Sequence, residues 1–100
     1  MRKALRVPAT LVCRDAVWPV QTVDLGRNGI CLVAPRPLEP GSRCTVTLDV
    51  PLGDGPATVT LSLKTIYSSY AATDAFKIGG RFVEVDAPIA EILGRFVAED

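Results

Sequence analysis

Two arginines near the start of the chain have a spacing suited to phosphate binding. Arg2 and Arg6 form an R-x-x-x-R pattern that leads into the first expected strand. A guanidinium donates hydrogen bonds through a planar fork that matches a phosphate or the O6/N7 edge of guanine, and its faces stack on bases. Two such groups on a flexible arm can converge on the phosphates of one ligand. The alternative is a solvated basic tail, because arginine pairs are common.

A second candidate is the segment Asp24-Leu25-Gly26-Arg27-Asn28-Gly29, which lies between two expected strands. Asn28-Gly29 is a strong hairpin signal, so the segment can be a purely structural turn. Asp24, however, ends a strand with a carboxylate that can accept hydrogen bonds from the N–H groups of guanine. The segment by itself leaves both interpretations open.

The residues that most enzymes need are missing from the sequence. The chain has no histidine, the most common general base. It shows no GxSxG motif, no P-loop and no paired carboxylates at strand ends. Cys13, Cys31 and Cys44 form no CxxC pair and have no histidine with which to complete a zinc site. We therefore expect a binding protein with no enzymatic activity, metal or cofactor.

The cysteines also bear on the cellular compartment. Each falls on the apolar face of an expected strand, which predicts buried, reduced thiols and hence a cytoplasmic protein. No apolar run reaches the ~18 residues of a membrane helix. No long apolar stretch follows the basic residues at the start, so we expect neither a secretory signal nor a membrane span.

The composition indicates one folded domain without affinity for duplex DNA. The chain has 100 residues, the length of one domain, and a hydrophobic content of 48%, which makes disorder improbable. Its 11 Lys and Arg balance its 11 Asp and Glu, whereas a face that binds duplex DNA is expected to be basic. The one cluster of cations, Arg2, Lys3 and Arg6, again lies at the start.

Alternation of apolar and polar residues predicts a mainly β fold. Every second residue is apolar in Arg43–Val50, and within Ala57–Tyr67 the apolar Val59, Leu61 and Leu63 alternate with polar residues. These two segments should therefore pair as a hairpin across the intervening turn. Gly79-Gly80 indicates a bulge or a close backbone approach within the last strand. The expected strands are Ala9–Arg14, Val17–Leu25, Gly29–Ala34, Arg43–Val50, Ala57–Tyr67 and Ala75–Val85. Six short strands favour a small barrel or sandwich.

The end of the chain is predicted to be helical. Asp86 can cap the helix, and Pro88 sits in the first turn, where a missing N–H is harmless. Apolar residues follow the helical period at Ile89, Ile92, Leu93, Phe96 and Val97. We expect this stripe to pack on the sheet, with binding of a partner as the alternative.

The arginine pair, the Asp24–Gly29 segment and their order along the chain resemble the PilZ family. That family has an R-x-x-x-R arm before the first strand and a [D/N]-x-S-x-x-G turn after the second. The resemblance spans essentially the whole chain and includes Gly41, Lys77–Phe82 and the final helix. It implies one domain over residues 1–100, an antiparallel six-stranded β-barrel with a C-terminal α-helix. Residues 1–8 would be a flexible Arg-rich arm, 9–86 the barrel and 87–98 the helix.

Many PilZ domains bind cyclic di-GMP, a bacterial second messenger, and the resemblance implies the same ligand here. Arg2 and Arg6 match the arginines that hold its phosphates and guanines. Asp24 and Gly29 match the ends of the second motif, where Asp24 would bond a guanine and Gly29 would permit a close backbone approach. Gly26 stands where the family has serine, so one hydroxyl contact is missing.

The implied function is that of a receptor. Binding of cyclic di-GMP would order the Arg2–Arg6 arm against the barrel and change the surface presented to an unidentified downstream protein. The alternative is a PilZ-like interaction module that no longer binds the nucleotide. Gly26 favours that alternative, whereas the arginine pair and Asp24 oppose it.

Overall fold

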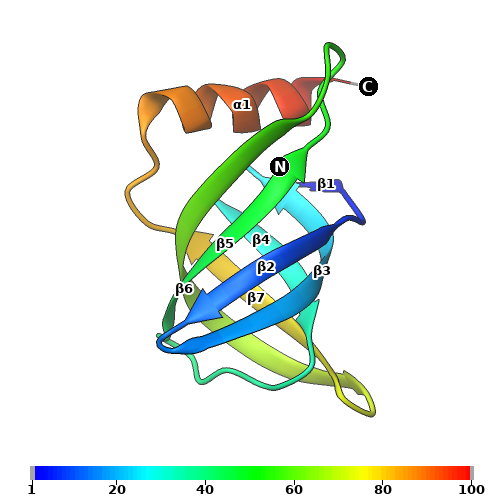
Figure 1. The fold of residues 1–100 in the computed structure, drawn as a ribbon, viewed down its shortest axis with the longest axis vertical. Coiled ribbons are helices and arrows are strands. Elements are labelled where there is room, and N and C mark those ends of the chain that lie inside the picture. The colour runs from blue at the N-terminus through cyan, green and yellow to red at the C-terminus, as the bar shows by residue number, and fades with distance from the viewer. Residues whose placement is uncertain (1, 100) are drawn as a thin grey trace.

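Six antiparallel strands close into a barrel in the computed structural model, which describes residues 2–99 (Figure 1). The barrel strands are β2 (Pro8–Cys13), β3 (Ala16–Gly26), β4 (Gly29–Ala34), β5 (Arg43–Val50), β6 (Ala57–Ala72) and β7 (Ala75–Phe82). They follow the order β3-β2-β5-β6-β7-β4, and β4 pairs back onto β3. This closure leaves no open edge among the six strands. The predicted mainly β fold and six-stranded barrel are thus confirmed.

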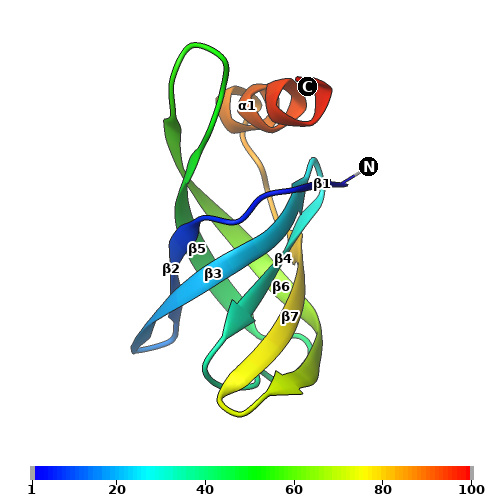
Figure 2. The same cartoon turned by 90° about the vertical axis from the view of Figure 1, so that its right-hand side faces the viewer.

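Helix α1 (Ala87–Ala98) lies across one end of the barrel (Figures 1 and 2). The side chain of Asp86 caps it by accepting a 3.0 Å hydrogen bond from the backbone N–H of Ile89, and Pro88 occupies the first turn. Leu93 and Phe96 are buried in the barrel core, and the other members of the apolar stripe pack against that core. The prediction that the stripe packs on the sheet is confirmed. Within residues 2–99, no helix has the length and apolar character needed to cross a membrane.

The first residues form a short seventh strand, where the sequence predicts a flexible arm. Strand β1 (Arg2–Ala4) pairs with β3, with Arg2 opposite Gly26 and Ala4 opposite Asp24. One edge of β3 pairs with β4 at these positions, so β1 must lie along the opposite edge. That opposite edge pairs with β2 over the first part of β3 and with β1 over its last residues. Figure 2 shows β1 beside the β3–β4 turn, below the helix.

A buried threonine holds the connection between β1 and β2 against the barrel. The Thr22 hydroxyl donates to the Leu5 carbonyl at 2.5 Å and accepts from the Val7 N–H at 2.9 Å. The Leu5 N–H donates to the Val23 carbonyl at 3.0 Å. Burial of the Leu5 side chain adds an apolar anchor. The backbone that leads from Arg2 to β2 is therefore fixed at several points.

The β6–β7 hairpin departs from the expected strand ends. β6 continues past Tyr67 to Ala72 because its last residues pair with β7 around a turn in which Asp74 has φ 56°. Alternation could not mark this extension, since its residues are mostly exposed on both faces. β7 ends at Phe82 rather than Val85, and Glu84 adopts φ 54° just beyond it.

The bulge predicted from Gly79-Gly80 is present, but its extra residue lies on the partner strand. Thr65 is opposite Gly80 and Tyr67 is opposite Gly79, so Ile66 is the unpaired residue in β6. The three cysteine thiols are free, as expected. Cys31 and Cys44 are buried as predicted, but Cys13 is only half-buried.

Candidate functional site

A cavity of about 240 Å³ opens where β1, the β3–β4 turn, β6 and β7 meet. Three of the predicted site residues, Arg2, Gly26 and Gly29, line it together. The sheet register explains this meeting, since Arg2 pairs with Gly26 across β1 and β3. The remaining lining residues are Asn28, Ile66, Gly80 and Arg81.

Asp24 does not line the cavity but forms an ion pair with Arg2. The distance from Arg2 Nη1 to Asp24 Oδ1 is 3.1 Å, and the two side chains are 47% and 30% exposed. An ion pair this exposed to solvent contributes only about 0–1 kcal/mol to stability. Little stability is therefore lost if Arg2 and Asp24 separate.

Arg6 lies apart from the cavity. Its side chain is exposed, and within residues 2–99 it forms no side-chain hydrogen bond or ion pair. Arg6 follows Arg2 by four positions, which a fully extended chain would span over roughly 13 Å. The two arginines do not converge in this structure, so both could touch one ligand only if it were long or the arm bent.

The wall of the cavity at Gly29 is tightly packed backbone. A Cβ atom on Gly29 would lie 2.5 Å from the Gly80 carbonyl oxygen, which leaves no space for any side chain. Gly29 faces Arg81 in the β4–β7 register. Gly26 is an extended strand residue and is not among the glycines with positive φ, which are Gly41 and Gly55.

Arg81 and Tyr67 belong to the surroundings of the site, although the sequence analysis did not select them. Arg81 is exposed and is the second arginine that lines the cavity. The Tyr67 hydroxyl lies 3.6 Å from Cys31 Sγ, and this contact, followed by burial, raises the pKa of Tyr67. The charges of Arg2 and Asp24 also act on the Tyr67 phenol, in opposite directions. The only feature of the sequence that could have pointed to Arg81 was the neighbouring glycine pair, Gly79-Gly80.

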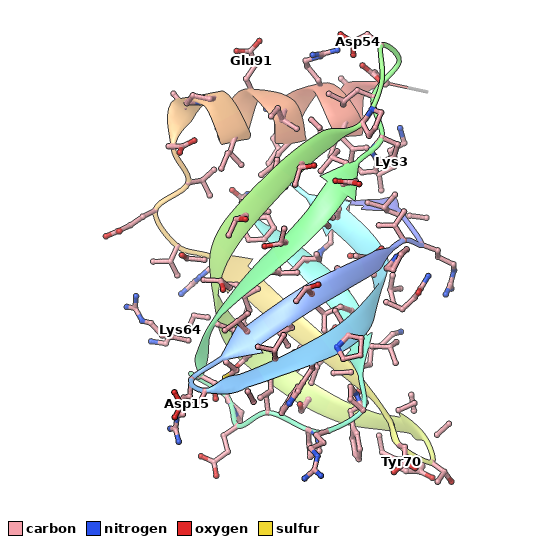
Figure 3. All side chains as sticks on the ribbon, viewed as in Figure 1. Lys3, Asp15, Asp54, Lys64, Tyr70 and Glu91 are labelled. Carbon is pink, nitrogen blue, oxygen red and sulfur yellow. The ribbon has the colours of Figure 1, made fainter. Side chains whose placement is uncertain are left out.

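Lys3 connects strand β1 to the C-terminal end of helix α1 (Figure 3). Its Nζ donates to the Phe96 carbonyl at 3.0 Å and to the Glu99 carbonyl, and it lies 4.7 Å from the centre of the Phe96 ring. A cation there satisfies terminal carbonyls and complements the helix dipole. Successive residues of β1 thus contact the cavity, through Arg2, and the helix, through Lys3.

We expect Lys3→Met to loosen the end of the helix. Methionine keeps much of the apolar stem but removes the charge and both hydrogen bonds, a loss of about 1–2 kcal/mol. For a domain of this size the melting temperature should fall by roughly 5–10 °C, with faster amide exchange at residues 95–99. Lys77→Met, which replaces an exposed lysine on β7, is the matched control. Equal melting temperatures for the two variants would contradict the role of Lys3.

Comparisons with known proteins agree with this architecture. A sequence profile of the PilZ domain matches residues 1–99. The fold is similar to that of the Bacillus subtilis inhibitor of motility, with a TM-score of 0.81 and 11% identity over 97% of this chain and 48% of that one. This chain therefore spans about half the length of the Bacillus protein. No curated protein matches the sequence.

A second solved structure has nearly the same length as this chain. The PilZ domain of CeSA from a cellulose-synthesizing bacterium matches with a TM-score of 0.66 and 14% identity, over 98% of this chain and 95% of that one. At such identities the structural likeness establishes the fold, whereas the match of the profile to nearly every residue establishes the family. The chain belongs to the PilZ domain family.

Proposed function

We propose that this PilZ domain is a receptor for cyclic di-GMP and that the dinucleotide binds at the cavity beside Arg2. The observation that carries the proposal is the gathering of Arg2, Gly26 and Gly29 around one cavity, which Arg81 also lines. Two arginines beside one cavity favour a phosphate, because a guanidinium can donate paired, charge-assisted hydrogen bonds to it. The proposed role is binding rather than catalysis.

Binding would exchange partners within the site. A phosphate of the ligand would take the place of the Asp24 carboxylate at Arg2, now 3.1 Å away. The released carboxylate could then accept hydrogen bonds from guanine N–H groups. At about 240 Å³ the cavity is too small for a whole dinucleotide, so the remainder would lie on the surface, where Arg6 is exposed.

Binding of the ligand at Arg2 would change the position of helix α1 through strand β1. A ligand that draws Arg2 away from Asp24 shifts the strand that also carries Lys3, and Lys3 holds the carbonyls of Phe96 and Glu99. A ligand can move an equilibrium only through its different affinity for the two states. The movement of α1 would change the surface that the domain presents to a downstream protein.

A protein-interaction module that does not bind the nucleotide is the second candidate. Two observations favour it. Gly26 lacks the hydroxyl that serine would supply, and Arg2 already has a partner in Asp24. Under this alternative the Arg2–Asp24 pair would be a structural tie between β1 and β3.

Calorimetric titration of the chain with cyclic di-GMP separates the two candidates. A receptor should bind with a micromolar or lower Kd, and the affinity should fall as salt is added, because salt screens contacts between arginine and phosphate. Duplex DNA should not bind tightly at physiological salt, since the chain has no net charge. No heat and no chemical-shift change at millimolar ligand would leave the interaction module as the function.

We expect Gly26→Ser to strengthen binding of cyclic di-GMP about two- to tenfold. One added neutral hydrogen bond is worth roughly 0.5–1.5 kcal/mol. Serine should cause no backbone strain, because Gly26 is extended and lacks a positive φ. Affinity and melting temperature should be measured together, with Gly53→Ser in the β5–β6 turn as the control. Weaker binding by Gly26→Ser at unchanged stability would contradict the assigned place of Gly26.

A further inference from the structure

Cys13 and Cys44 lie on the neighbouring strands β2 and β5, one residue beyond the last pair of their ladder. The β2–β5 ladder runs as far as Val12 opposite Thr45, and one further residue in the same register brings Cys13 opposite Cys44. Side chains alternate along a strand, so both cysteines share the barrel-facing side with Leu11, which is buried two residues before Cys13. The register therefore places the two thiols next to each other on the barrel-facing side of β2 and β5.

Two further observations indicate that the thiols are neighbours. Burial, followed by the interaction with the Cys13 thiol, raises the pKa of Cys44 to about 12. The Cys13 thiol also donates to the carbonyl of Arg43, the residue before Cys44, at 3.7 Å. Directly opposed residues of antiparallel strands have Cα atoms about 4.5–5.5 Å apart. That separation lies within the roughly 4.4–6.8 Å that a disulfide spans.

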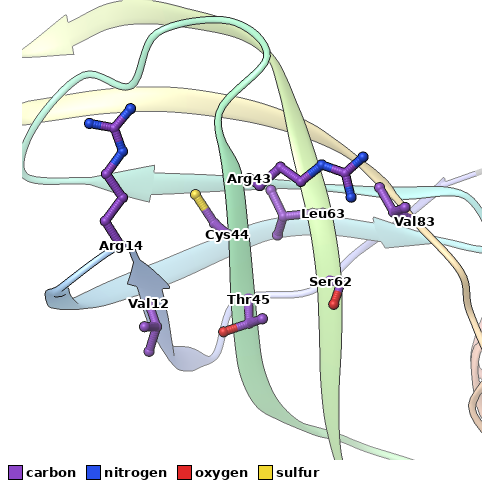
Figure 4. A pocket seen from close by; sticks show the side chains of 8 residues that line it. All are labelled: Val12, Arg14, Arg43, Cys44, Thr45, Ser62, Leu63 and Val83. Atoms are coloured by element: carbon purple, nitrogen blue, oxygen red, sulfur yellow. The ribbon is translucent and has the colours of Figure 1, made fainter.

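The half-buried Cys13 is the thiol that a reagent in solution can reach, whereas Cys44 is buried. Cys13 lines a cavity of about 310 Å³, and Cys44 lines another of about 290 Å³. Arg14 lines both cavities, and Arg43 lines the one beside Cys44 (Figure 4). Both arginines are exposed. Against these two cations, one carboxylate, that of Glu39, lines the cavity beside Cys13, so the remaining positive charge attracts anionic reagents.

We propose that Cys13 and Cys44 are a reversible redox pair, oxidised to an intramolecular disulfide by a small anionic disulfide of the glutathione class. The Cys13 thiolate attacks one sulfur of the reagent, breaks its S–S bond and releases one small thiol. The Cys44 thiolate then attacks the Cys13 sulfur of the mixed disulfide and releases the second. The two protein thiols are oxidised, the reagent is reduced, and its two thiols take up the two protons.

The disulfide would close a long loop that contains β3, the β3–β4 turn and β4. A cross-link of this length stabilises a fold mainly by restricting its unfolded chain. Cys31 is not part of the pair, because its thiol contacts the Tyr67 hydroxyl on another side of the barrel. The inference does not depend on whether the chain binds a nucleotide.

The test is to equilibrate the full chain in glutathione buffers of increasing oxidation. Mass spectrometry after alkylation should find a Cys13–Cys44 disulfide, with Cys31 as the remaining free thiol. The melting temperature should rise by roughly 10–30 °C and return on reduction. Cys31→Ser should behave like the wild type, and Cys13→Ser should form no internal disulfide. A lasting glutathione adduct, a disulfide between two chains or one that includes Cys31 would overturn the inference.

A charge variant tests the choice of oxidant. Arg14 has φ 57°, a conformation that asparagine tolerates, so Arg14→Asn removes the charge with little backbone strain. This variant should react severalfold more slowly than the wild type with oxidised glutathione, but at the same rate with a disulfide that carries no negative charge. Equal slowing with both reagents would contradict an anionic oxidant.

Discussion

Arg2→Ala is expected to weaken binding of cyclic di-GMP by about ten- to a hundredfold. Arg2 is the only arginine of the R-x-x-x-R pair that lines the cavity, at 47% exposure of its side chain. Loss of a charge-assisted contact typically costs about 1.5–3 kcal/mol, which corresponds to that range of affinities. Calorimetric titration of the variant and the wild type at the same salt concentration measures the difference.

Two further variants make this experiment specific. Arg2→Lys keeps the charge but loses the planar fork, so its affinity should lie between those of wild type and Arg2→Ala. Arg36→Ala removes an exposed arginine that does not line the cavity, and it should bind like the wild type. Stability should change little in Arg2→Ala, since only an exposed ion pair with Asp24 is lost. Wild-type affinity in Arg2→Ala would rule out this cavity as the site.

The strands were predictable wherever one face is buried and the other is not. Gly29–Ala34 and Arg43–Val50 have the predicted bounds, and the helix follows its cap at Asp86. The far end of β6 was not predictable, because Ser68–Ala72 projects beyond the core and its pattern carries no burial signal. The end of β6 is determined by its pairing with β7, and a pattern within β6 alone cannot reveal that pairing.

The residues of the site were predictable only where a local motif marks them. Arg2, Gly26 and Gly29 were selected from motifs within single stretches of sequence, and the fold brings all three to one cavity. Arg81 could not be selected, because only the pairing of β4 with β7 sets it opposite Gly29. Ile66 reaches the cavity through a bulge that depends on the β6–β7 register.

The arm shows how a local prediction depends on distant residues. Residues 1–8 carry several charges and no long apolar run, a pattern typical of a solvated segment. What orders Arg2–Val7 in the structure is the edge of β3, the buried hydroxyl of Thr22 and the carbonyls at the end of α1. The last of these lie more than ninety residues away from Lys3 in the sequence.

Gly29→Ala is expected to lower both the stability of the barrel and its affinity for cyclic di-GMP. The new methyl carbon would lie 2.5 Å from the Gly80 carbonyl oxygen, so β4 and β7 must move apart. Overpacking of this kind costs roughly 1–3 kcal/mol, and the melting temperature should fall by about 10 °C. Gly29, Gly80 and Arg81 line the same cavity, so the shift should also change the shape of the cavity and weaken binding about tenfold or more.

Gly53→Ala provides the matched control for this prediction. The nearest atom to a Cβ on Gly53 is Glu99 Oε1 at 3.7 Å, an ordinary contact, so that variant should melt close to the wild type. Thermal unfolding and calorimetric titration of both variants distinguish two roles of Gly29. A fall in stability with unchanged affinity would mean that Gly29 only lets β4 approach β7 and that the ligand lies elsewhere. A fall in both, at a temperature where Gly29→Ala is still folded, links the close approach of β4 and β7 to the binding site.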